Sequence, residues 1–234
     1  MYICEKFVLS VANRNLWRDK TDTYAHIRAY LITKIRIVCG ITILFNHFFN
    51  LPIEEFMNAL NKKAVRQMVR AEIAKLSEDA KRALSDSIFD AVYRLNEVQS
   101  ASTIALFVSL ADEPQSANII AKLSPSKRIV VPRIEGDEME FYDISAGLER
   151  GAFNIMEPIA TTPIEPSEID VMVVPGVAFT RNGARCGRGK GFYDKYISRR
   201  GFRAYTIGVC YPCQVVEALP SEPHDKVIDE VIYE

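Results

Sequence analysis

Short, almost continuous apolar runs are the feature that most constrains how this chain can fold. Four of them stand out, at residues 103–109 (TIALFVS), 127–132 (KRIVVP), 170–174 (DVMVV) and 204–209 (AYTIGV). Runs of this length without polar alternation are typical of strands buried on both faces of a parallel sheet. Segments of helical character lie between them, at 114–123 and 192–199. We therefore predict a single-domain, three-layer α/β/α fold with a mostly parallel sheet, whose functional sites gather at the carboxyl ends of the strands.

Two amphipathic helices are predicted before the first strand. The segment 58–76 carries apolar side chains at helical spacing, namely Val65, Val69, Ile73 and Leu76. Ser77, followed by two acidic residues, is a good N-cap for a second helix that runs to about Leu95. Further strands are expected at 139–144 and 231–233.

The first 56 residues show no helical or strand period that continues for long. Their most apolar stretch, 37–45, is followed by Asn46 and His47, well short of the roughly 18 to 20 uninterrupted apolar residues that a spanning helix needs. Two interpretations are open: an appendage that packs on the domain, or a segment upstream of a natural start at Met57. We favour the second, because regular periodicity begins only at Met57. The chain thus divides into an N-terminal extension of unknown role, 1–56, and one domain, 57–234.

Charge and cysteine content narrow the class of protein. The 234 residues include 29 Lys and Arg against 30 Asp and Glu, so the net charge of −1 provides no general basic field for nucleic acid. The five cysteines are unevenly spaced, which predicts reduced thiols and no disulfide framework. We expect a cytoplasmic monomer with small-molecule partners and with neither nucleic acid nor membrane as a partner.

The residues with the clearest chemistry are concentrated in 174–194 (VPGVAFTRNGARCGRGKGFYD), between a predicted buried strand and a predicted helix. Three glycines there alternate with Arg188 and Lys190, so that the backbone can approach a polyphosphate while two cations reach its oxygens. The order of residues matches neither a Walker A loop nor the dinucleotide-binding GxGxxG pattern. Because the loop lies where backbone N–H groups open a helix, we predict an anion site rather than a solvated basic loop.

The string PGVAFTRNGARCGRGKGFYDKY resembles the 5-formyltetrahydrofolate cyclo-ligase family, whose pattern is PGxAFDxxGxRxGxGxGYYD. The resemblance extends to the KxxxR of Lys62 and Arg66, to the strand-end segment that closes with Glu113, and to Pro223-His224-Asp225. It covers about residues 60–234. The sequence departs from the family pattern at Thr180, Phe192, Gln115 and Ser116.

The resemblance implies an enzyme that uses ATP and Mg²⁺ to convert 5-formyltetrahydrofolate into 5,10-methenyltetrahydrofolate, with release of ADP and phosphate. The formyl oxygen would be phosphorylated, giving an iminium phosphate that the N10 amine attacks. Such a reaction depends on positioning and on neutralising charge around the transferred phosphoryl group.

By resemblance, the site residues fall into groups. The catalytic cations would be Lys190, Arg188 and Arg185. Nucleotide contacts would come from Lys62, Arg66, Arg185, Cys186, Gly187, Arg188, Gly189, Lys190, Gly191 and Tyr193. Folate contacts would come from Val108, Glu113, Phe153, Phe192 and Tyr193. The Mg²⁺ ligands would be Asp194 and Asp225, since carboxylate oxygens suit this ion. Helix patterning alone would instead place Lys62 and Arg66 on a solvated helix face.

Two other classes of function stay open. Cys210-Tyr211-Pro212-Cys213 is a CxxC after a predicted strand and before a possible helix at Gln214, which is a pattern of thiol-disulfide oxidoreductases. Its position near the end of the domain argues against that function, and a zinc site would need two more ligands. A noncatalytic nucleotide-binding regulator on the same fold is the third possibility.

Overall fold

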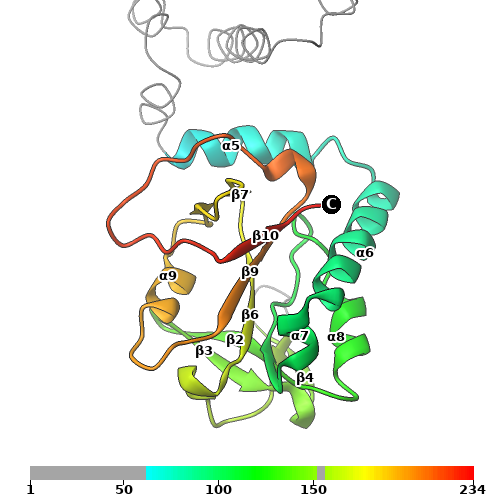
Figure 1. Cartoon of the computed structure of the whole chain (residues 1–234), viewed down its shortest axis with the longest axis vertical. Helices are drawn as coiled ribbons and strands as arrows, with labels where there is room; N and C mark the ends of the chain where they lie inside the picture. Colours follow the sequence, from blue (N-terminus) through cyan, green and yellow to red (C-terminus); the bar gives the residue numbers. More distant parts are fainter. Residues whose placement is uncertain (1–61, 152–155) are drawn as a thin grey trace, which may run out of the picture. The chain divides into compact units, whose positions relative to one another are not determined.

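The computed structural model describes residues 62–151 and 156–234. A six-stranded sheet has the order β10-β9-β6-β1-β2-β3, and all neighbouring strands are parallel except β2 and β3 (Figure 1). The strands are β1 (Thr103–Ala105), β2 (Arg128–Glu135), β3 (Glu138–Asp143), β6 (Val171–Pro175), β9 (Tyr205–Val209) and β10 (Glu230–Ile232). The predicted mostly parallel sheet is confirmed.

Helices cover both faces of this sheet. They are α5 (Lys62–Ile73), α6 (Glu78–Arg94), α7 (Asn96–Ser100), α8 (Ala117–Leu123) and α9 (Phe192–Ile197). Figure 1 shows α6, α7 and α8 together on one side of the sheet, α9 on the other, and α5 across one end. Both helices predicted before the first strand are therefore present. The predicted start of α5 at Asn58 lies outside the described residues.

The strand β6 explains the three layers. Its side chains alternate between two apolar clusters, as the period of a strand requires. Val171 and Val173 pack with residues of α5, α6 and α8, whereas Met172 and Val174 pack with Tyr196 of α9. A strand buried on both faces has no polar alternation, which is why 170–174 is a continuous apolar run.

The first apolar run differs from its prediction, since β1 ends at Ala105 although the run extends to Ser109. Side-chain hydrogen bonds hold the following segment as a loop. The Ser109 hydroxyl donates to the carbonyl of Pro114 at 2.8 Å, and the Ser116 hydroxyl donates to the carbonyl of Phe107 at 2.6 Å. These hydroxyls satisfy the backbone where a longer strand or helix would otherwise do so.

Two short hairpins were not anticipated from the sequence. One pairs β4 (Leu148–Arg150) with β5 (Met156–Pro158), and the other pairs β7 (Ala178–Phe179) with β8 (Arg185–Cys186). The second hairpin stands at the carboxyl end of β6 and begins the glycine-rich loop. Among the described residues, no helix is long and apolar enough to cross a membrane.

Candidate active site

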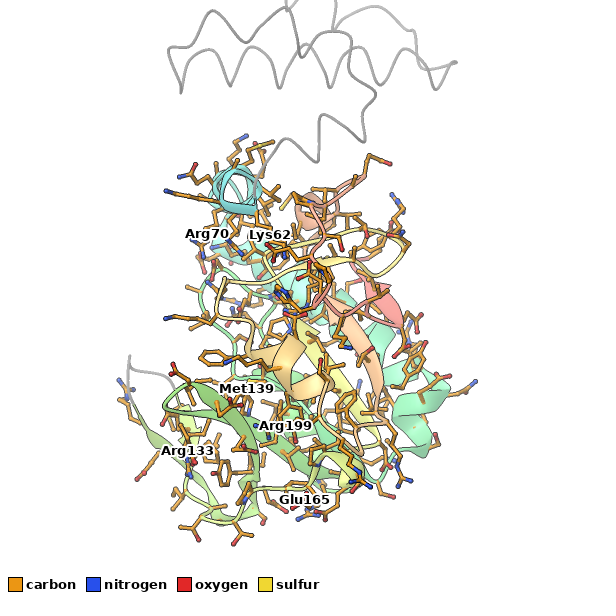
Figure 2. All side chains as sticks on the ribbon, turned by 90° about the vertical axis from the view of Figure 1, so that its left-hand side faces the viewer. Lys62, Arg70, Arg133, Met139, Glu165 and Arg199 are labelled. Atoms are coloured by element: carbon orange, nitrogen blue, oxygen red, sulfur yellow. The ribbon has the colours of Figure 1, made fainter. Side chains whose placement is uncertain are left out.

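A cavity of about 360 Å³ opens at the carboxyl ends of the central strands. Its walls include residues that follow β1, residues of β2, and Pro175 at the end of β6, which is where sites were predicted. Figure 2 shows Lys62 at the start of α5, whereas Met139 and Arg133 lie well away from Lys62, on the β2–β3 hairpin. All three line the cavity. We call the part near Lys62 the phosphate end and the part near Met139 the folate end, after the ligands that the family resemblance implies for them.

The glycine-rich loop, 187–191, forms one wall of the phosphate end. Gly189 and Gly191 have φ values of 105° and 69°, a region that glycine adopts without steric cost. Helix α5 holds the loop, because Arg66 Nε donates to the carbonyl of Gly187 at 2.7 Å. Arg66 also lies against Gly189, where an added Cβ would stand 3.5 Å from its guanidinium. Arg66 is thus part of the site and not of a solvated helix face.

Arg185 is the most deeply buried cation of the phosphate end, with its side chain 4% exposed. One guanidinium nitrogen donates to Asp194 Oδ2 at 2.8 Å, and the guanidinium lies 5.6 Å from the ring centre of Tyr193. Its Nε has no hydrogen-bond partner in the part of the chain that the structure describes. A buried donor without a partner beside a cavity fits an anionic ligand.

Of the two predicted metal ligands, Asp194 lies beside the segment that carries Asp225. Asp194 Oδ1 accepts from the backbone N–H of Lys226 at 3.1 Å, one residue beyond Asp225. Lys62 Nζ lies 2.7 Å from both carboxylate oxygens of Asp225 and 2.8 Å from Glu222 Oε2. Through these five groups, the start of α5 and the start of α9 are both bonded to the C-terminal segment 222–226.

The ion pair changes the acidity of both partners. Burial alone would lower the pKa of Lys62, but its hydrogen bonds to Asp225 and Glu222 outweigh burial and raise that pKa. Burial alone would raise the pKa of Asp225, but the hydrogen bond from Lys62 and the backbone N–H of Glu222 hold it below its ordinary value. Asp225 therefore carries its charge and offers hard oxygen ligands. Glu222 and His224 place further ligand atoms within 4.8 Å of it.

Arg188 crosses the cavity to two acidic residues after β1. Its Nε and one terminal nitrogen donate to Glu113 Oε1 at 3.0 and 2.8 Å, and the same terminal nitrogen donates to Asp112. Glu113 Oε2 accepts from the backbone N–H of Leu110 at 3.0 Å. Burial would raise the pKa of Asp112, but the hydrogen bond from Arg188 outweighs it and lowers that pKa. Asp112 is thus ionised, and both side chains accept hydrogen bonds from Arg188.

Lys190 differs from the other cations of the phosphate end. It lines the cavity and is exposed, and across 62–151 and 156–234 it has no hydrogen-bond or ion-pair partner. Its ammonium group is therefore available to a ligand without first leaving a carboxylate.

The folate end is mostly apolar. Its walls include Val108, Pro132, Ile134, Met139 and Phe192, together with the ring of Tyr193 and the carboxylate of Glu157. Tyr193 packs edge-on against Phe141 at 6.4 Å, and burial raises the pKa of its phenol, so the phenol stays neutral. The predicted folate residue Phe153 lies outside the described residues.

Comparison with known proteins shows the family of the chain. The family model described as the 5-formyltetrahydrofolate cyclo-ligase family matches residues 58–234. The chain belongs to this family. This confirms the resemblance found in the sequence and the predicted enzyme class.

Individual relatives of the cyclo-ligase family cover most of the chain. A 5-formyltetrahydrofolate cyclo-ligase of Mus musculus is 26% identical over 74% of this chain and 93% of its own length. A 5,10-methenyltetrahydrofolate synthetase structure from Aquifex aeolicus superposes with a TM-score of 0.67, at 32% identity, over 74% of this chain and 89% of that one. One from Mycoplasma pneumoniae gives 0.62, at 26% identity, over 74% and 98%.

The CxxC segment lacks what a redox site of another class would need. Cys210 is fully buried, and burial raises the pKa of its thiol and, to a smaller extent, that of Cys213. A single 3₁₀ turn, Pro212–Gln214, follows instead of a helix whose N-terminus could stabilise a thiolate. Cys186 is also buried and has a raised pKa. The raised thiol pKa values and the short turn therefore give no support to a thiolate at Cys210 or Cys213.

Sequence reasoning missed three acidic residues in or beside this cavity. Asp112 holds Arg188, Glu222 holds Lys62, and Glu157 lies at the folate end. Asp112 and Glu222 stand beside residues that were predicted, but single acidic residues in loops carry no period or spacing that would mark them. Glu157 stands on the unanticipated hairpin β4–β5.

Proposed function

We propose that this chain converts 5-formyltetrahydrofolate into 5,10-methenyltetrahydrofolate, using ATP and Mg²⁺ and releasing ADP and phosphate. The observation that carries the proposal is one cavity with five cations toward one end, Lys62, Arg66, Arg185, Arg188 and Lys190, and a largely apolar wall that also holds Arg133 and Glu157 at the other. A triphosphate requires the cations, and a pteridine ring requires the apolar wall. The two reacting groups, the γ-phosphoryl group and the formyl oxygen, would meet between them.

The chemistry divides into two displacements. The formyl oxygen attacks the γ-phosphorus and ADP leaves, which turns a poorly electrophilic formyl amide into an iminium phosphate. The N10 amine then attacks the formyl carbon, the carbon–oxygen bond breaks, and phosphate leaves with the original formyl oxygen while N10 loses its proton. The two displacements together release ADP and phosphate, and the formyl oxygen ends in the phosphate.

The cations of the phosphate end support the first displacement. Negative charge spreads over the transferred phosphoryl oxygens, and fixed cations in a partly closed site stabilise it. Lys190 is free to approach these oxygens, while Arg185 is held in place by Asp194 and offers a buried Nε–H. On nucleotide binding, the guanidinium of Arg188 would release the carboxylates of Asp112 and Glu113 and donate to phosphate oxygens instead. Lys62 and Arg66 would bind the same polyphosphate from α5.

Asp194 and Asp225 would hold the Mg²⁺ ion. Asp194 accepts from the backbone N–H next to Asp225, and the lowered pKa of Asp225 keeps that carboxylate ionised. When bound, the ion supplies positive charge that neutralises and orients the phosphate oxygens. The ammonium of Lys62 is bonded to both carboxylate oxygens of Asp225. It would therefore turn toward the polyphosphate as the ion is bound.

The folate would lie against Val108, Phe192 and Tyr193 at the other end of the cavity. Glu113 would contact the pteridine once Arg188 is drawn to the nucleotide. The predicted contact by Phe153 remains part of this proposal.

The decisive experiment mixes the protein with ATP, Mg²⁺ and 5-formyltetrahydrofolate and follows the absorbance of the methenyl product together with ADP. The proposal requires product in equal amount to ADP, and no product when ATP or Mg²⁺ is omitted. A protein that binds ATP but forms no methenyl product would instead be a noncatalytic nucleotide-binding regulator.

Residues 57–234 are proposed to be sufficient for this activity, because the family match begins at 58. A truncated protein that starts at Met57 would keep the melting temperature and turnover of the full chain. Loss of either would show that 1–56 contributes to the fold or the site. Action as a monomer and a cytoplasmic location belong to the same proposal, and sedimentation and cell fractionation test them.

A further inference from the structure

Glu157 is the cavity carboxylate that has no ion-pair partner within 62–151 and 156–234. Five acidic residues line the cavity: Glu113, Glu157, Asp194, Glu222 and Asp225. Arg188 pairs with the first of these, Arg185 with Asp194, and Lys62 with both Glu222 and Asp225. Glu157 alone among them has no ion-pair or hydrogen-bond partner in the described part of the chain.

The position of Glu157 is costly for the fold. It stands directly opposite Glu149 in the antiparallel pair of β4 and β5, and like charges in that relation repel. Its carboxylate also lies over the backbone of Gly151, where an added Cβ would come within 2.3 Å of Cδ and Oε2. A residue that breaks local rules without a structural gain points to a functional role.

Arg133 fixes the hairpin that carries Glu157. One of its terminal nitrogens donates to the carbonyls of Pro158 and Ala160, each at 3.0 Å, and its guanidinium lies 3.9 Å from the ring centre of Tyr142. Since Arg133 belongs to β2, these bonds fasten the end of β5 to the sheet. The carboxylate of Glu157 is thereby held near the apolar wall formed by Pro132 and Ile134.

The surroundings select what Glu157 can bind. An acceptor with negative charge, beside apolar walls, suits a flat ring with N–H groups at its edge. The reduced pteridine of 5-formyltetrahydrofolate carries such donors at its 2-amino group, N3 and N8. The phosphates and the glutamate tail of the substrates are anionic, and Glu157 would repel both.

We propose that Glu157 is a substrate-recognition residue whose carboxylate accepts hydrogen bonds from the N–H edge of the pteridine. This inference rests on the proposed function, because it takes 5-formyltetrahydrofolate as the ligand. It assigns Glu157 to binding and not to the transfer of the phosphoryl group.

The test compares the wild-type full chain with Glu157→Gln and, as a matched control, Glu149→Gln. Each variant removes the same like-charge repulsion across β4 and β5, so both should melt at or slightly above the temperature of the wild type. Hydrogen bonds to a charged group are worth about 1.5–3 kcal/mol, so the Kd for 5-formyltetrahydrofolate should rise about tenfold to a hundredfold in Glu157→Gln. In Glu149→Gln it should stay within about twofold of wild type.

Three further readouts separate recognition from other roles. The KM for the folate should rise in Glu157→Gln, while kcat and the Kd for a nonhydrolysable ATP analogue should not change. The loss of affinity should be the same for the monoglutamate and pentaglutamate forms of the substrate. Tighter binding of the pentaglutamate by Glu157→Gln would show instead that Glu157 acts on the tail by repulsion.

The outcomes decide between the inference and its premise. An unchanged folate Kd in Glu157→Gln, or a loss of fold in that variant alone, would overturn the role of Glu157. A wild-type chain that fails to bind 5-formyltetrahydrofolate would overturn the proposed function itself.

Discussion

The two ends of the cavity are built in opposite ways. The phosphate end comes largely from one continuous segment, 185–194, and most of its cations are held by carboxylates: Arg185 by α9, Arg188 by the loop after β1, and Lys62 of α5 by the C-terminal segment. The folate end comes from separate strands and hairpins, is largely apolar, and contains Glu157, which has no ion-pair partner among the described residues. If a polyphosphate binds as proposed, Lys62 and Arg188 must exchange ion-pair partners at the charged end, whereas Glu157 has no ion pair to give up among the described residues.

Among the cations of the phosphate end, Lys190 and Arg188 differ most in how many carboxylates hold them. Arg188 is held by two carboxylates, so binding of phosphate to it is offset by the loss of those contacts. Lys190 has no such contact among the described residues and can act on the transition state without that cost. Four experiments test how the cavity and the segments around it work.

Lys190→Ala should lower kcat on the order of 10² to 10³-fold, because removing one preorganised donor to a transition state typically has an effect of that size. Lys190→Arg should restore only part of the rate, since a planar guanidinium differs from a compact ammonium. Binding of the folate should not change. Lys63→Ala, an exposed lysine of α5 that does not line the cavity, is the control. A kcat for Lys190→Ala within about threefold of wild type would remove Lys190 from catalysis.

Gly183→Ala should destabilise the phosphate end through the backbone. Gly183 has a φ of 87°, and an added Cβ would come within 2.0 Å of the carbonyl oxygen of Ile228 in the segment that carries Asp225. We expect a loss of about 3 kcal/mol in the free energy of unfolding, measured in urea.

Gly136→Ala is the control for this prediction, because Gly136 also has a positive φ, of 63°, but nothing lies within 4 Å of its added Cβ. It should cost about 1 kcal/mol, the penalty of the backbone conformation alone. Equal losses in the two variants would show that packing of the C-terminal segment on the loop contributes nothing.

Asp112→Asn should strengthen ATP binding by about twofold to fivefold, since a partly exposed ion pair is worth up to about 1 kcal/mol and its loss releases Arg188 toward phosphate. Asp79→Asn changes the net charge equally at an exposed site of α6 and should leave the Kd unchanged. Weaker ATP binding by Asp112→Asn would mean that Asp112 orients Arg188 for the nucleotide instead of restraining it.

Replacing both Cys210 and Cys213 with Ala should leave turnover within about twofold of wild type, because phosphoryl transfer needs no thiolate. The buried position of Cys210 predicts a stability loss of about 1 kcal/mol. A fall in turnover of tenfold or more in a variant that remains folded would restore a role for the CxxC segment.

How far the sequence could predict the site depends on the same contrast between its ends. Arg185, Arg188 and Lys190 are neighbours in the chain and stand among glycines, so local pattern and family resemblance were enough to select them. The pairing of Lys62 with Asp225 joins residues 163 positions apart, and no local pattern contains it. Glu157 reaches the cavity only because the β4–β5 hairpin, which has weak strand signals, is fastened to β2 by Arg133.

The fold shows a similar division. Apolar runs predicted the central strands because burial on both faces leaves a continuous pattern. The early end of β1 was not predictable from hydropathy, since it depends on hydroxyl groups of Ser109 and Ser116 that bond to nearby backbone groups.

In the proposed reaction, the phosphoryl group passes across the cavity from the phosphate end to the formyl oxygen at the folate end. Labelling that formyl oxygen of 5-formyltetrahydrofolate with ¹⁸O reports on this transfer. A single turnover with ATP and Mg²⁺, followed by mass spectrometry of the released phosphate, should show the label in phosphate in proportion to the methenyl product. Unlabelled phosphate, with ¹⁸O found only in water or in remaining substrate, would contradict the transfer and separate ATP hydrolysis from the cyclisation.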